Sequence, residues 1–270
     1  MSIKTKPLSF WLPLAVLIIY ALITLGCLSG LLASNFELTH NELSYQSPSA
    51  QYWMGTDFFG RSILERSMQA TKNAMLVGVC STAIALLIAM VLGSMAGFFG
   101  GWIDEVVVWF YTTLDSIPYI LLLAAFAFAL GQGMINVFLA LGLTSWTTLC
   151  KIIRAETMKI KKMDYILAAQ AQGQTTLKIL WQEILPNISH LIIVQAGLIF
   201  ISVVKIEVVL SFLGLGVAPG TPSWGLMIYD AKDELTRDIC WGFTAATVLM
   251  FGLILASQLA LESLRKANDR

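Results

Sequence analysis

Charge is the scarcest property of this sequence. Asp, Glu, Lys and Arg make up 13% of its 270 residues, whereas hydrophobic residues make up 57%. That charged share is about half of what soluble domains carry. The acidic and basic residues also cancel to a formal net charge of zero, so no overall positive field favours a nucleic acid as partner. Because the apolar residues come in long blocks, the sequence predicts an all-α integral membrane protein.

Cysteine, histidine and catalytic motifs are sparse as well. The cysteines and histidines stand singly, at Cys27, Cys80, Cys150, Cys240, His40 and His190. None of them has metal-ligand spacing, so we expect no metal site. The sequence also has no GxxxxGK[ST] loop that would cradle nucleotide phosphates, and no HExxH or GxSxG motif of an intramembrane enzyme.

Six apolar blocks are long enough to cross a bilayer. We expect a short N-terminus at residues 1–9, a first span at 10–33, and five more spans within a core at 74–262 that is followed by a C-terminal segment at 263–270. The first block is longer than the apolar part of a signal peptide, so we expect it to be retained as a span.

The first loop, residues 34–73, is polar and is expected on the extracytoplasmic side. Within it, Ser62 and Glu65 fit a capping box, and Ile63 and Met68 favour a short helix that lies on the membrane surface. An ordinary solvated loop is the alternative.

Glycine and proline residues are expected to shape the second and third spans. Gly93 and Gly97 permit close approach of another helix to span two. The segment Asp115–Pro118 interrupts span three, where Pro118 lacks a backbone donor and should kink the helix.

A polar, basic island at residues 152–187 separates the fourth and fifth spans. The excess of Lys and Arg in this island and at the chain ends places it and both termini in the cytoplasm. The island has the pattern of two short helices with a hinge. Gly173 breaks the first, Thr175 or Thr176 can cap the second, and Pro186 is expected to stop it.

The island resembles the cytoplasmic EAA loop of ABC importer permeases, on the segments Tyr165–Ala169, Gly173 and Ile184–Asn187. Two positions depart from that pattern. Leu167 stands where the loop is named for Glu, and Glu183 stands where a basic or aromatic residue precedes Ile-Leu-Pro. These departures bear on which ATPase docks at the loop.

Three further segments resemble the dipeptide, oligopeptide and nickel permeases, and the short first outer loop resembles that of the subunit usually called C. They are Gly55–Arg61, Asp115–Pro118, and the stretch from Glu207 through Ser211–Gly216 to Thr221–Gly225. The resemblance implies a type I ABC importer permease fold with a cytoplasmic coupling helix. It also implies a multi-pass protein of the bacterial inner membrane that forms half of a translocation pathway and is not itself an enzyme.

The partners implied by this resemblance are a second, homologous permease subunit, two cytoplasmic ATPase subunits and an extracytoplasmic solute-binding protein, with membrane lipid around them and no nucleic acid. No cofactor is expected on this chain, because ATP and Mg²⁺ belong to the ATPase subunits. The residues expected in the coupling loop are Tyr165, Ala168, Ala169, Gly173, Leu185 and Pro186.

Charged and glycine-rich positions of spans three and five are candidates for the pathway or its gate. They are Asp115, Pro118, Lys205, Glu207, Ser211, Gly214 and Gly216. Charges within a span are costly and usually face a cavity or the bundle interior. The alternatives are an ion pair with a partner subunit, snorkelling of Lys205, and a glycine turn that is only a tight loop.

Peptide import is the expected function, with nickel or metal chelates as the alternative cargo. A stand-alone, ion-coupled secondary transporter is a second alternative, in which Asp115 and Glu207 would carry protons. The large cytoplasmic loop and the lack of an inverted repeat disfavour it.

Overall fold

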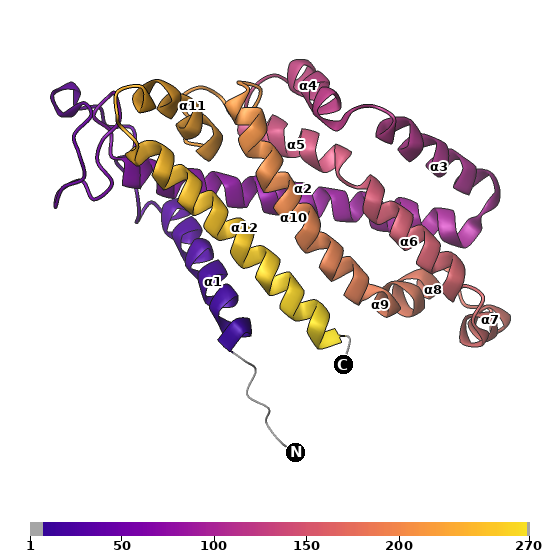
Figure 1. Cartoon of the computed structure of the whole chain (residues 1–270). Helices are drawn as coiled ribbons and strands as arrows, with labels where there is room; N and C mark the ends of the chain where they lie inside the picture. Colours follow the sequence, from indigo (N-terminus) through magenta and orange to yellow (C-terminus); the bar gives the residue numbers. More distant parts are fainter. Residues whose placement is uncertain (1–7, 269–270) are drawn as a thin grey trace. The chain divides into compact units, whose positions relative to one another are not determined.

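The computed structural model describes residues 8–268, and within that range it is built from helices and contains no strand (Figure 1). The ends of the predicted cytoplasmic termini, residues 1–7 and 269–270, lie outside the described residues. The long helices are α1 (Leu8–Leu28), α2 (Ile63–Phe99), α3 (Gly101–Asp115), α4 (Tyr119–Leu130), α5 (Met134–Thr144), α6 (Thr147–Ile160), α10 (Ser189–Phe212), α11 (Trp224–Leu235) and α12 (Trp241–Asn268). The all-helical prediction is confirmed.

Five stretches of helix are apolar and long enough to cross a membrane, and the bent pair α3 and α4 makes a sixth when it is counted as one span. The five are α1, α2, α5 with α6, α10 and α12. The α3–α4 pair bends by 93° between Asp115 and Tyr119. Pro118 explains the break, because it donates no backbone hydrogen bond and disfavours helical conformation at the residue before it.

The chain forms two compact units. One contains the chain up to Val79, Leu130–Val137 and the chain from Ile201 on, and the other contains Cys80–Ala129 and Phe138–Phe200. In the first unit α1 packs along α12, and the Tyr20 hydroxyl donates a hydrogen bond of 2.6 Å to the Leu249 carbonyl (Figure 1).

The first apolar block leaves the helical conformation at Leu28, before the expected boundary at residue 33. Gly30 adopts a φ of 74°, and the backbone N–H groups of Leu31 and Leu32 both turn back to the Gly26 carbonyl. A left-handed residue of this kind closes a helix, and glycine adopts that conformation without strain.

The expected short surface helix does not exist as a separate element. Residues 63–73 are the first turns of α2, which runs on without interruption from Ile63 to Phe99. No glycine or proline stands between Ile63 and Asn73 to end a helix there. The capping interaction is present in part, since the Glu65 N–H donates to the Ser62 hydroxyl at 3.4 Å.

Within the second unit, α2 and α6 pack backbone to backbone at two glycines. A Cβ placed on Gly93 would lie 2.8 Å from the Cys150 carbonyl oxygen, and one on Gly97 would lie 2.6 Å from the Arg154 carbonyl oxygen. The close approach predicted from the Gly93 and Gly97 spacing is therefore present, and α6 is the partner helix.

We predict that Gly97→Ala lowers the thermal stability of the purified protein, because the added methyl group overpacks the α2–α6 contact. The expected cost is about 1–3 kcal/mol. Val79→Ile adds a methylene on an exposed position of the same helix and should leave the melting temperature unchanged. Equal melting temperatures for the two variants would contradict the tight contact.

Candidate functional site

The island at residues 152–187 begins inside α6, which continues to Ile160, and its next helix is α7 (Asp164–Ala171), with eight residues and one buried and one exposed side. Ile166 and Ala169 are buried, whereas Tyr165, Leu167 and Ala168 are exposed. Ala169 therefore packs inside the island. Leu167, which stands where the family motif has Glu, points outward and is 49% exposed. The outward side offers an apolar contact surface without an acidic group at its centre.

Gly173 ends α7 in the left-handed conformation that its position in the sequence predicts, with a φ of 77°. The Gly173 N–H donates to the Gln170 carbonyl, and the Gln174 N–H donates to the Ala169 carbonyl. These two bonds together form a complete Schellman motif. No atom of the described chain lies within 4 Å of a Cβ placed on Gly173, so the backbone angle alone favours glycine here.

The helical second half of the island ends at Asn187, one residue after Pro186, and Ile188 separates it from α10. Helix α8 (Thr176–Ile179) continues through a π-helical turn at Leu180–Ile184 into α9 (Leu185–Asn187), and α10 begins at Ser189. The π turn replaces the regular α-helical hydrogen bonds just before the proline. Pro186 then lies in the first turn of α9, where its missing N–H is tolerated. Thr175 occupies the N-cap position of α8, but its side chain makes no capping bond.

A hydrogen bond joins the two halves of the island. The Asn187 side-chain amide donates to the Tyr165 hydroxyl at 3.0 Å and to the Glu183 carbonyl at 2.6 Å. Leu185 is buried beside it, and Pro186 is exposed. The residues that match the family pattern at either end of the loop thus contact each other.

Basic residues at the start of the island bind within the chain. Arg154 makes a bidentate ion pair with Asp104 of α3. Lys161 donates a hydrogen bond to the Phe98 carbonyl at the end of α2. Lys151 pairs with Asp115 at 2.5 Å. These contacts hold α6 against α2 and α3, so the segment that leads into α7 is braced.

Glu207 lies in a buried corner where α10 meets the loop that leads to α11. It is 2% exposed, and its Oε1 accepts hydrogen bonds from the Ser211 hydroxyl at 2.7 Å and the Ser223 hydroxyl at 3.0 Å. Ser223 also caps α11 by accepting from the Gly225 N–H. Gly216 is needed nearby, because a Cβ there would lie 2.7 Å from the Ser211 backbone nitrogen. The bond to Ser223 therefore fastens the loop before α11 to α10, and the Ser211 hydroxyl accepts a hydrogen bond from the Val217 N–H at 3.4 Å.

The remaining pathway candidates have different surroundings. Lys205 is exposed and, within residues 8–268, forms no ion pair. Gly214 is exposed with a φ of 76°, and its carbonyl accepts from the Gln132 side chain at 2.9 Å. Asp115 and exposed Pro118 belong to the second compact unit.

The sequence pattern did not reveal a carboxylate cluster between the first loop and α11. Asp57 accepts bonds from the backbone N–H groups of Phe59 and Arg61 and from the Arg61 and Arg66 side chains. Arg66 also lies 3.9 Å from Asp230 of α11. The motif Gly-Thr-Asp with Gly-Arg marked Asp57 and Arg61, but no local signal pointed to their α11 partners.

Glu234 completes this cluster and is 5% exposed. Burial raises its pKa to about 7, helped by the charges of Asp57 and Asp230 and opposed by Arg66. Burial also raises the pKa of Asp230, against the effect of Arg66. The cluster is thus a pH-sensitive contact between the first loop and α11.

A family model described as binding-protein-dependent transport system inner membrane component matches residues 89–268. The chain belongs to this family. The matched range contains the whole island, with α7 and Gly173, and the Glu207 corner.

Three relatives of this permease illustrate the range of similarity. The oligopeptide transport system permease protein OppC of Bacillus subtilis is 31% identical over 87% of this chain and 81% of its own length. The dipeptide transport system permease protein DppC of the same organism is 34% identical over 72% of this chain and 61% of its own length. The di/tripeptide permease protein DppC of Pseudomonas aeruginosa is 33% identical over 82% and 72%.

We predict that the stability of the permease falls as pH rises through the pKa of Glu234. The folded-state pKa of about 7 exceeds the ordinary value of 4.5, so the folded protein keeps a proton that the unfolded chain has released. The stabilisation is full below pH 4.5 and is lost as pH rises through 7. In a series of melting temperatures measured against pH, Glu234→Gln should remove the decrease near pH 7. Glu42→Gln, at an exposed position, should retain that decrease. Parallel profiles for the wild type and Glu234→Gln would refute the assignment.

Proposed function

We propose that this chain is a C-type permease subunit of an ABC importer for short peptides and forms half of the translocation pathway. The named peptide permeases among its relatives support this proposal, and they support peptide over nickel as the cargo class. The coupling part of the proposal rests on α7, a short helix with an exposed apolar side. The preceding helix α6 is held in place by the ion pair of Arg154 with Asp104.

The exposed side of α7 fits a docking role for cytoplasmic ATPase subunits. Tyr165, Leu167 and Ala168 would contact the ATPase, and Gly173 would set the direction of α7 relative to α8. Because Arg154 and Lys161 hold α6 to its neighbours, a push on α7 would reach α2 and α3 rather than bend the loop. Rigid elements of this kind transmit displacement between domains.

The proposed assembly contains a second, homologous permease subunit, two ATPase subunits and an extracytoplasmic solute-binding protein. ATP and Mg²⁺ would bind to the ATPase subunits, and this chain would carry no cofactor of its own. We place both termini and the island in the cytoplasm, on the basis of the Lys and Arg distribution. Lys205, exposed on α10 without an ion pair in the described chain, would then face the second permease subunit or the pathway.

Gly173→Val should uncouple the importer without unfolding the permease. A β-branched residue at a φ of 77° costs about 1 kcal/mol or more, and the structure leaves open space for the side chain, so the strain falls on the direction of α7. We expect normal membrane insertion, but loss of ATPase co-purification and at least about a tenfold loss of peptide uptake.

Gly173→Asn is the matched control, because asparagine tolerates the left-handed conformation better than other residues with a Cβ. It should retain most of the uptake and of the ATPase binding. Uptake by Gly173→Val at the wild-type rate would show that this turn does not set a coupling geometry.

A further inference from the structure

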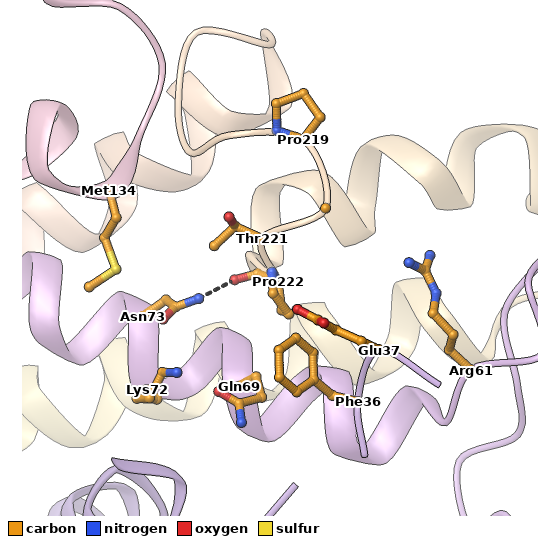
Figure 2. A pocket seen from close by; sticks show the side chains of 11 residues that line it. Phe36, Glu37, Arg61, Gln69, Lys72, Asn73, Met134, Pro219, Thr221 and Pro222 are labelled. Atoms are coloured by element: carbon orange, nitrogen blue, oxygen red, sulfur yellow. Dashed lines mark hydrogen bonds between the residues drawn. The ribbon is translucent and has the colours of Figure 1, made fainter. Parts of the chain in front are cut away.

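A cavity of about 570 Å³ lies in the first unit, at the end of α2 that the charge distribution places outside (Figure 2). Its walls come mainly from three segments: the loop after α1, the first turns of α2 and the loop before α11. Figure 2 shows their side chains gathered around one space, with the Asn73 amide bound to the Pro222 carbonyl at 2.8 Å. Sites for small molecules in proteins have volumes of about 300–1,000 Å³, so the size is in the functional range.

Two unpaired charges of opposite sign line this cavity, Glu37 from the loop and Lys72 from α2 (Figure 2). Within residues 8–268, neither side chain makes an ion pair or a hydrogen bond. Asp57, by contrast, forms ion pairs with both Arg61 and Arg66. The cavity therefore has an anionic and a cationic contact to offer.

Arg61 is a third charged group at the cavity and is held in place. Its Nε donates to Asp57 at 2.8 Å, and its guanidinium lies 4.6 Å from the centre of the Phe59 ring. The donors on its terminal nitrogens are not used by that bond. A cation that is already ordered loses little side-chain entropy when it binds an anion.

Gln69 adds a polar group without a partner to the wall. It is 4% exposed, and its amide nitrogen donates to the Ala33 carbonyl at 3.0 Å, whereas its Oε1 is buried and accepts no hydrogen bond. Buried acceptors without a donor are uncommon and costly in proteins. The Gln69 Oε1 is therefore an acceptor without a donor behind this wall of the cavity.

We propose that this cavity binds a small zwitterion, with Glu37 toward its ammonium group and Lys72 toward its anionic group. A short peptide has both charges, and on the proposed import function it would be the cargo at an outer reception site. The headgroup of phosphatidylethanolamine has the same two charges and is the other source of this chemistry. Phe36 and Met134 also line the cavity and offer apolar contact.

The test uses the full-length permease in nanodiscs made of phosphatidylglycerol only, with alanyl-alanine as the probe in saturation-transfer NMR titrations. N-acetyl-alanyl-alanine lacks the ammonium group, and alanyl-alanine amide lacks the carboxylate. We expect the wild type to bind alanyl-alanine about tenfold more tightly than either capped form, as is typical for a lost hydrogen bond to a charged group.

Two variants assign the two ends of the ligand. Glu37→Gln should remove only the preference over the N-acetyl form, and Lys72→Gln should remove only the preference over the amide. Glu42→Gln, in the same loop but outside the cavity, and Lys162→Gln, at an exposed position of the island, should behave like the wild type.

The lipid source is tested by native mass spectrometry of permease purified from mixed lipids. Retention of phosphatidylethanolamine by the wild type and its loss in Glu37→Gln, without dipeptide binding, would assign the zwitterion to the headgroup. Equal binding of all three dipeptides together with equal lipid retention in every variant would overturn the proposal. Peptide uptake by the assembled importer would be unaffected by that result, so a failed cavity and a failed import function are distinguishable.

Discussion

Inside a bilayer every backbone N–H and C=O group has to find its hydrogen-bond partner within the protein. This constraint favours helix along the membrane-spanning parts of the chain. A break in such a helix therefore needs a specific local cause. The breaks coincide with residues whose backbone disfavours the regular hydrogen-bond pattern of an α-helix. Pro118 separates α3 from α4 within an apolar stretch, whereas Gly173, which closes α7, and the π turn at Leu180–Ile184, which leads into Pro186, lie in the polar island.

Carboxylates near several helix ends are held by basic side chains. Asp104 binds Arg154 beside the turn between α2 and α3, and Asp57 gathers Arg61 and Arg66 at the start of α2. Glu207 is the exception, a buried carboxylate that two serine hydroxyls hold in place. In the proposed coupling mechanism, the contacts around α6 stiffen the base of the island, so that movement at α7 is passed on to the spans.

The sequence was most informative where the cause of a structure is local. Proline and glycine act through their own backbone, so the break at Pro118 and the left-handed turn at Gly173 could be predicted from single residues. Close packing at Gly93 and Gly97 follows from their spacing, although the partner helix does not. Pro186 was expected to stop a helix, and the structure places it inside α9, which ends one residue later at Asn187, but the π turn before it could not be predicted.

Contacts between distant residues could not be predicted in the same way. Lys151 and Asp115 are 36 positions apart, and Glu207 and Ser223 are 16 apart, so their pairing depends on how the helices pack. The continuous start of α2 was missed for a related reason: its polar residues looked like a loop, but many of their side chains are buried in the fold. Ser67 and Thr71, for example, are both fully buried.

Uptake of a radiolabelled dipeptide by cells that lack this permease, compared with complemented cells, tests the central claim most directly. We expect that deletion abolishes dipeptide uptake, that depletion of ATP with an intact proton gradient abolishes it in complemented cells, and that nickel uptake is unchanged. Loss of nickel uptake with normal dipeptide uptake would contradict the peptide assignment. Dipeptide uptake that persists without ATP would contradict the ABC importer mechanism itself.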